Sequence, residues 1–356
     1  MKTNEMQNYK NSLHSLNALI KRNLIKITSL SIQIPENRTL VRLIFILLII
    51  IPASIIVSTC SKDEEKLDRE LKEALTTRLN KDINADSLES VVQWLQGMGT
   101  RFALADNHRD VAVKIKNRFI RLGFNDSRID SFMINRIYKG INYEQWQYNV
   151  IASITGTDYP DSVCVIGSHY DSILSSGDPF SAAPGANDNA SGVAATIELA
   201  RVMKKNNYTP ANSIEFVAFG SEELGLYGSH DYAKNAFMDS KKIKFMLNND
   251  MVSYMPYTNK EAWSVNIMDY DNSHGLRTEA ETLIEKYCDL NYFNNNIFNR
   301  QSDSYPFFVN GYKALFFYSG ASDPFYHTLE DTAEKYNFEY CREIVKACCA
   351  LLVYNN

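Results

Sequence analysis

The feature that most constrains the fold of this chain is an alternation of short apolar runs with longer helical stretches between residues 85 and 356. The apolar runs are rich in Val, Ile and Phe, which is typical of buried strands, and Gly or polar residues end several of them. The expected strands are 148–154, 162–167, 213–220, 243–249 and 314–318, and the expected helices are 86–96, 109–122, 190–205, 223–236, 274–288 and 337–353. Strands alternating with helices predict a single α/β domain with a central, mostly parallel mixed sheet flanked by helices on both faces.

Composition excludes several other classes of protein. The chain has 356 residues, of which 45% are hydrophobic and 22% charged, so it is neither disordered nor fibrous. A formal net charge of −5 gives no basic excess for a polyanion, and we therefore expect no nucleic-acid partner. Six cysteines are too few for a disulfide-built scaffold of this length, so apolar burial must hold the core.

The N-terminal region is organised differently. Residues 43–57 form an almost unbroken apolar run, preceded by Arg42 and followed by the polar stretch 61–66. This run is short for a bilayer span, which needs about 20 residues, but suits the core of a signal peptide. Residues 1–59 contain seven Lys or Arg and two Asp or Glu, a positive flank that favours the cytoplasmic side. We therefore predict an N-terminal lead and signal peptide over residues 1–59.

The end of this segment resembles the lipobox of bacterial lipoproteins. Val57-Ser58-Thr59 precedes Cys60, although Thr59 stands where Gly, Ala or Ser is usual. The resemblance implies lipidation of Cys60, a polar tether over residues 60–84 and a catalytic domain over residues 85–356. The protein would then be exported and anchored by lipid in a bacterial cell envelope, at the periplasmic face or the outer surface. The alternative is an uncleaved signal anchor, which also implies a membrane partner.

Polar residues with ligand chemistry stand where the predicted strands end. They are His169 and Asp171 after 162–167, Asp188 before helix 190–205, Glu222 and Glu223 after 213–220, Asp250 after 243–249, and His327 after 314–318. Ligand sites of open α/β sheets lie beyond the carboxyl ends of the strands, so these side chains are expected to converge on one crevice. Two histidines and several carboxylates are the ligands that a hydrolytic zinc pair requires.

Six motifs occur in the order found in the co-catalytic zinc aminopeptidases. They are GSHYDS (167–172), GANDNASG (185–192), FGSEELGLYGS (219–229), NNDMVSY (248–254), SDSYPF (302–307) and YHTLEDT (326–332). The chain resembles this family, which includes bacterial leucyl aminopeptidases and aminopeptidase Y, over residues 85–356. The resemblance implies a metal-dependent exopeptidase that uses two zinc ions per chain and hydrolyses N-terminal residues from peptide substrates.

The resemblance also implies a role for each matching residue. His169 and Asp250 match the ligands of one zinc ion, Glu223 and His327 match those of the other, and Asp188 matches the carboxylate that bridges both. Glu222 matches the general base, and Asp171 matches the carboxylate that orients a histidine ligand. These residue types suit the chemistry. Two zinc ions bridged by a carboxylate lower the pKa of a bound water, and a second carboxylate can relay the proton of that water to the leaving amine.

Two departures and two alternatives accompany this interpretation. Ser304 stands where the family often has His, and Asn189 stands where a second Asp is commoner. One alternative is a glutaminyl cyclase, a single-zinc acyltransferase on a similar fold, whose second motif lacks the stretch seen here at residues 189–192. The other is a catalytically inert peptidase-like ectodomain that binds a partner. Such inert proteins have lost metal ligands, whereas this chain retains a metal-binding residue at all five ligand positions and a glutamate at the position of the general base.

Overall fold

The computed structural model describes residues 63–356. The predicted signal peptide over residues 1–59 and the predicted lipidation site Cys60 lie outside the described residues. The chain divides into two units, residues 1–77 and 78–356, and the fold described below is that of the second unit. Residues 63–82 are helical. Over residues 63–356, no helix combines the length and the apolar character that crossing a membrane requires.

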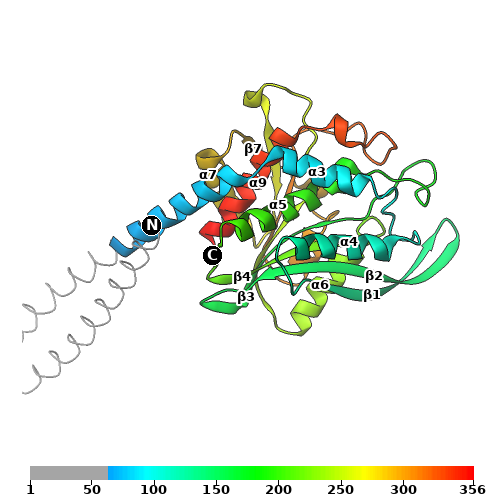
Figure 1. Ribbon diagram of the computed structural model, residues 1–356, viewed down its shortest axis with the longest axis horizontal. Helices are drawn as coiled ribbons and strands as arrows, with labels where there is room; N and C mark the ends of the chain where they lie inside the picture. Colours follow the sequence, from blue (N-terminus) through cyan, green and yellow to red (C-terminus); the bar gives the residue numbers. More distant parts are fainter. Residues whose placement is uncertain (1–62) are drawn as a thin grey trace, which may run out of the picture. The chain divides into compact units, whose positions relative to one another are not determined.

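The second unit is built on one eight-stranded sheet, whose strands follow the order β1-β2-β4-β3-β5-β8-β6-β7 (Figure 1). The bounds are β1 Arg128–Tyr138, β2 Ile141–Ile154, β3 Tyr159–His169, β4 Asn212–Phe219, β5 Lys242–Asn249, β6 Ser264–Met268, β7 Asn291–Phe293 and β8 Ala314–Ser319. The four central strands, β4, β3, β5 and β8, are parallel. The pairs β1–β2, β2–β4 and β6–β8 are antiparallel. The expected mostly parallel mixed sheet is confirmed.

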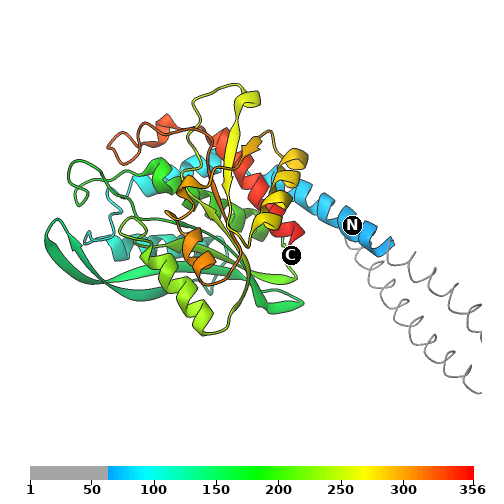
Figure 2. The same ribbon diagram turned by 180° about the vertical axis from the view of Figure 1, so that it is seen from behind.

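Helices cover both faces of this sheet. Their bounds are α3 Ala85–Gln96, α4 His108–Arg121, α5 Gly192–Lys205, α6 Tyr227–Met238, α7 His274–Tyr287, α8 Ser304–Val309 and α9 Phe338–Tyr354. Figure 1 shows α3, α4, α5 and α9 in front of the sheet, and the reverse view in Figure 2 shows α6 and α8 on the other face. This arrangement confirms the expected helices on both faces.

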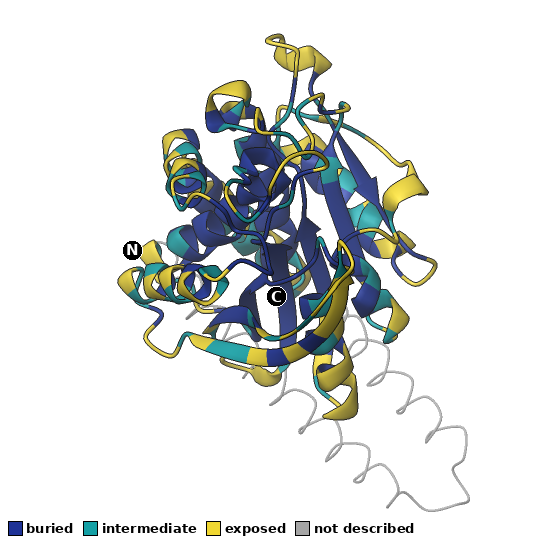
Figure 3. Ribbon diagram, turned by 90° about the vertical axis from the view of Figure 1, so that its right-hand side faces the viewer, coloured by how far each residue is buried: buried dark blue, intermediate teal, exposed yellow. Residues whose placement is uncertain are grey.

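Apolar burial holds the unit together. All eight residues of β4 and the last seven of β3 are buried, as expected for strands covered by helices on both faces of the sheet. Figure 3 shows this buried sheet at the centre and the exposed surface on the outer helices and loops. The five described cysteines are free, and four of them, Cys164, Cys341, Cys348 and Cys349, are buried. Within residues 63–356 no disulfide contributes to stability.

Two expected helices begin later than predicted, and both differences concern the site. The helix expected from residue 223 is α6, which starts at Tyr227, because Ser221, Gly225 and Leu226 adopt positive φ angles incompatible with a helix. The helix expected from residue 190 is α5, which starts at Gly192 after a turn in which Asp188 and Asn189 are not helical.

Three strands, β1, β6 and β7, and the first half of β2 were not predicted. The strand β1 and the first half of β2 carry exposed polar residues between their apolar ones, and the short strands β6 and β7 have only 5 and 3 residues. Their sequences therefore lack the continuous apolar run that reveals the central strands.

Candidate metal centre

The sheet brings all seven candidate residues to one end of its parallel strands. His169 is the last residue of β3, Asp250 directly follows β5, and His327 lies in the loop after β8. Glu222 and Glu223 lie in the turn between β4 and α6, and Asp171 lies two residues beyond β3. Asp188 lies in the turn that precedes α5, and the Asp188–Asn189 peptide bond is cis. The crevice expected at this edge of the sheet is therefore where the residues meet.

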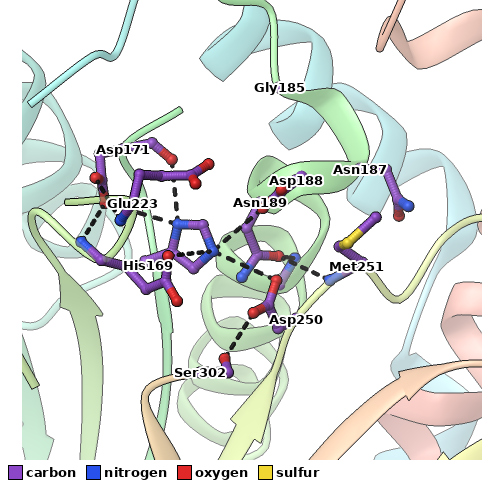
Figure 4. Close-up of polar contacts among 12 residues, drawn as sticks. His169, Asp171, Gly185, Asn187, Asp188, Asn189, Glu223, Asp250, Met251 and Ser302 are labelled. Atoms are coloured by element: carbon purple, nitrogen blue, oxygen red, sulfur yellow. Dashed lines mark hydrogen bonds and ion pairs between the residues drawn. The ribbon is translucent and has the colours of Figure 1, made fainter. Parts of the chain in front are cut away.

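One group of ligand atoms is formed by His169, Asp188 and Asp250. The Nε2 atom of His169 lies 3.2 Å from Asp188 Oδ1 and 3.3 Å from Asp250 Oδ1. Figure 4 shows both carboxylates pointing toward the imidazole ring. All three side chains are buried, so a cation placed among them would have protein ligands on several sides.

A second group is formed by Asp188, Glu223 and His327. The Nε2 atom of His327 lies 3.0 Å from Asp188 Oδ2 and 3.1 Å from Glu223 Oε2. Asp188 thus faces His169 with one carboxylate oxygen and His327 with the other. This is the arrangement that a carboxylate bridging two ions requires.

The residues present fit zinc. Asp250 Oδ1 and Glu223 Oε1 are buried oxygens that accept no hydrogen bond within the described residues. A buried carboxylate oxygen left without a partner is costly, and a bound cation would remove that cost. Imidazole nitrogens with carboxylate oxygens form a donor set that zinc commonly takes in hydrolases.

Glu222 belongs to neither group, although it is the neighbour of Glu223. Its Oε2 atom lies 3.9 Å from His169 Nε2. It lines a cavity of about 570 Å³ together with members of both groups and with apolar residues that include Met251, Ile297 and Phe316. A carboxylate beside the two groups and facing the same cavity is placed to exchange protons with a molecule bound there.

Burial and close charges shift the pKa values at this site in opposite directions. Burial raises the pKa of Glu222 well above its ordinary value, and it raises that of Glu223, with the charge of Asp188 adding to the rise, to about 8. Burial also opposes ionisation of Asp188, but His169 and His327 hold its pKa below the ordinary value. Burial disfavours the charged form of His327, yet the close carboxylates of Asp188 and Glu223 raise its pKa to about 10. Close contact with the two histidines thus stabilises the charge of Asp188, whereas burial disfavours the charges of Glu222 and Glu223.

Asp171 supports the site through more contacts than predicted. The Nδ1 atom of His169 lies 3.2 Å from the backbone carbonyl oxygen of Asp171 and 3.6 Å from its carboxylate Oδ1. The same carboxylate accepts hydrogen bonds from the backbone N–H groups of Glu222, at 3.0 Å, and Glu223, at 3.2 Å. Asp171 therefore fixes the turn that carries the two glutamates as well as the imidazole ring.

Three residues that support the site were not predicted from the sequence. Two of them, Ser302 and Asp331, lie within the motifs 302–307 and 326–332. Ser302 donates a hydrogen bond of 2.6 Å to Asp250 Oδ2 (Figure 4). Asp331 accepts the backbone N–H groups of Asn187, at 2.7 Å, and Asp188, at 3.2 Å. The fully buried Arg101 donates to the carbonyl oxygens of Tyr170, Pro184 and Gly185. These contacts hold the loops that present His169 and Asp188.

A family model described as peptidase family M28 matches residues 149–352. The chain belongs to this family. Among its relatives, leucine aminopeptidase 1 of Pyrenophora tritici-repentis is 31% identical over 236 residues, covering 64% of this chain and 60% of that one. A probable aminopeptidase of Saccharomyces cerevisiae is 27% identical over 220 residues, covering 60% and 58%. The chain thus spans about 60% of the length of these relatives.

Solved structures with the same fold support the architecture of this M28 member. LapB from Legionella pneumophila superposes with a TM-score of 0.67 at 24% identity, covering 79% of this chain and 74% of that one. BSAP, a zinc aminopeptidase from Bacillus subtilis, superposes with a TM-score of 0.63 at 19% identity, covering 77% and 95%. At these identities the similarity establishes the α/β fold.

Proposed function

We propose that this M28 family member is an aminopeptidase that uses two zinc ions. The observation that carries the proposal is that Asp188 faces His169 with one oxygen and His327 with the other, at 3.2 Å and 3.0 Å. His169 and Asp250 would hold one ion, Glu223 and His327 the other, and Asp188 both. The aminopeptidase names of the relatives support the proposal, although the chain spans only about 60% of their length.

The chemistry divides between the metal and the chain's own residues. Zinc, when bound, acts as a Lewis acid toward a carbonyl group and lowers the pKa of water. Glu222 would accept a proton from the attacking water as its oxygen adds to the scissile carbonyl carbon. It would then deliver that proton to the leaving nitrogen as the C–N bond breaks. Asp171 would keep Glu222 and Glu223 in place through its two backbone contacts.

The cavity beside the two groups suits an apolar N-terminal residue. Met251 and Phe316 are buried at its wall, and Phe293, Ile297 and Phe298 line it from a more exposed segment. An apolar side chain bound there would leave water, which contributes about 0.8 kcal/mol for each buried CH₂ group. We therefore propose a preference for peptides that begin with a large apolar residue.

Turnover of peptides by the purified full chain tests this function. The substrates are peptides with free and with acetylated N-termini and one that begins with Gln, each tested before and after chelation and zinc restoration. The proposal predicts release of residues from free N-termini only, loss with chelator and recovery with zinc. Cyclisation of N-terminal Gln without hydrolysis would instead indicate a glutaminyl cyclase. Bound zinc without any turnover would indicate a binding module.

We also propose that the protein is exported and anchored to the bacterial cell envelope by lipid on Cys60. The apolar run 43–57, the basic residues before it and the polar tether after Cys60 support this proposal. The uncleaved signal anchor remains the alternative, and the two differ in the mass of the mature chain.

A further inference from the structure

The strand β1 forms one edge of the sheet, and within the described residues no strand pairs with its outer side. The hairpin β1–β2 pairs Tyr138 with Ile141 across a two-residue turn. In such a hairpin the two residues next to the turn form backbone hydrogen bonds with each other. Hydrogen-bonded pairs then recur at every second residue along the strands. The backbone N–H and C=O groups of alternate residues, from Ile129 through Met133 to Ile137, therefore face away from β2. An edge of this length is a template for another strand.

We propose that β1 pairs with β1 of a second copy of this chain, antiparallel and with Met133 on the two-fold axis. This register overlaps all 11 residues of the strand. It places Ser131 opposite Asn135 and Ile129 opposite Ile137 of the second copy. These residues have outward-facing backbone groups, so each pair can form ladder hydrogen bonds. A symmetric pairing of this kind uses the same surface on both copies and closes as a dimer.

The charges along β1 select this register. With Met133 on the axis, Asp130 of each copy lies opposite Arg136 of the other. Arg136 is exposed and makes no ion pair within the described residues, whereas Asp130 contacts Arg128 Nε at 3.2 Å. Moving the axis to residue 132 would place Arg128 opposite Arg136, and like charges facing each other are unfavourable. Opposite charges and full overlap thus occur in the same register.

The side chains beside this edge are unusually apolar for a solvent-facing strand. Met133 is 46% exposed and Ile137 67% exposed, and the cross-strand partner of Met133, Trp146, is 53% exposed. Successive residues of a strand alternate in direction, so these three side chains lie on one face of the hairpin. Self-pairing would bring Met133 against Met133 and Ile137 against Ile129 of the second copy, and would remove part of this surface from water.

Cysteine cross-linking of the full chain tests the register. Met133→Cys places a thiol opposite its own copy, with Cα atoms about 5.5 Å apart in a hydrogen-bonded pair, within the range of a disulfide. Oxidation is expected to give a dimer band on a denaturing gel, and reductant should convert that band to monomer. The matched control is Ser131→Cys on the same edge, which faces Asn135 and should stay monomeric. A cross-link in neither variant, or equally in both, would overturn the proposal.

Charge reversal tests the same pairing without a new thiol. Asp130→Arg or Arg136→Asp alone removes two ion pairs and adds two like-charge contacts, which should raise the dimer dissociation constant roughly tenfold. The double variant restores opposite charges and should recover the wild-type constant, measured by sedimentation. A wild-type chain that stays monomeric at every concentration would refute self-pairing. That result would also cover the case in which a strand of another protein pairs with this edge.

Discussion

Replacement of Glu222 by Gln should abolish turnover while leaving the metal in place. Glu222 is 9% exposed and belongs to neither group of ligand atoms. Within the described residues, the one other carboxylate that lines the cavity outside those groups is Asp323. It already accepts hydrogen bonds from Asn187 Nδ2 and the backbone N–H of Phe325, both at 2.8 Å. Asp323 is therefore held by partners of its own and is not free to replace Glu222.

A positioned general base contributes about 10²–10⁴-fold to rate, and we expect a loss near the upper end because the site offers no substitute. A loss of 10⁴ corresponds to about 5.4 kcal/mol of transition-state stabilisation. The assay is kcat on an aminoacyl chromogenic substrate together with zinc content at saturating metal. Zinc content and KM should remain close to the wild-type values.

The matched control is Glu223→Gln, which changes the adjacent and chemically identical residue. The Oε2 atom of Glu223 lies 3.1 Å from His327 Nε2, so amide replacement removes a charged ligand from the second group. Activity and zinc content should fall together, and excess zinc should restore part of the activity. If zinc is lost in Glu222→Gln instead, or if that variant turns over normally, the assignment of base and ligand is wrong.

Three further predictions concern the surroundings of the site and the N-terminus. Ser302→Ala removes the hydroxyl that donates to Asp250, and zinc titration should show affinity reduced about 10–100-fold; unchanged affinity would contradict this role. Arg101→Met leaves three carbonyl oxygens, two of them buried, without their donor and should lower the free energy of unfolding, measured by urea denaturation, by about 3–5 kcal/mol. A change below 1 kcal/mol would contradict that estimate. Cys60→Ser should leave the chain uncleaved or release it from the membrane fraction; unchanged mass and partition would indicate a signal anchor.

The sequence predicts the central part of the fold and most of its site for the same physical reason. Strands buried on both faces, such as β3 and β4, must be continuously apolar, so their ends are visible in the sequence. The polar residues at those ends, such as His169 and Asp250, are then placed on one edge by the topology of a parallel sheet. The positions of the central strands and the edge where the candidates meet follow from these patterns.

The features that the sequence does not predict depend on contacts between distant segments. The turn that holds Glu222 and Glu223 looks helical in sequence, because positive φ angles at Ser221 and Leu226 are not encoded by glycine. Arg101 lies far from the motifs, and its three acceptors are known only when the loops are folded. The edge strand β1 has too few consecutive apolar residues to be recognised, since its outer side faces solvent.

The number of zinc ions bound to the full chain tests the central claim most directly. If Asp188 bridges two ions, metal analysis at saturating zinc should find two ions per chain, and His327→Ala should retain the ion held by His169 and Asp250. Asp188→Asn should weaken both sites, because each oxygen of its carboxylate faces a different histidine. One ion per wild-type chain, or two ions retained at wild-type affinity by Asp188→Asn, would contradict the account.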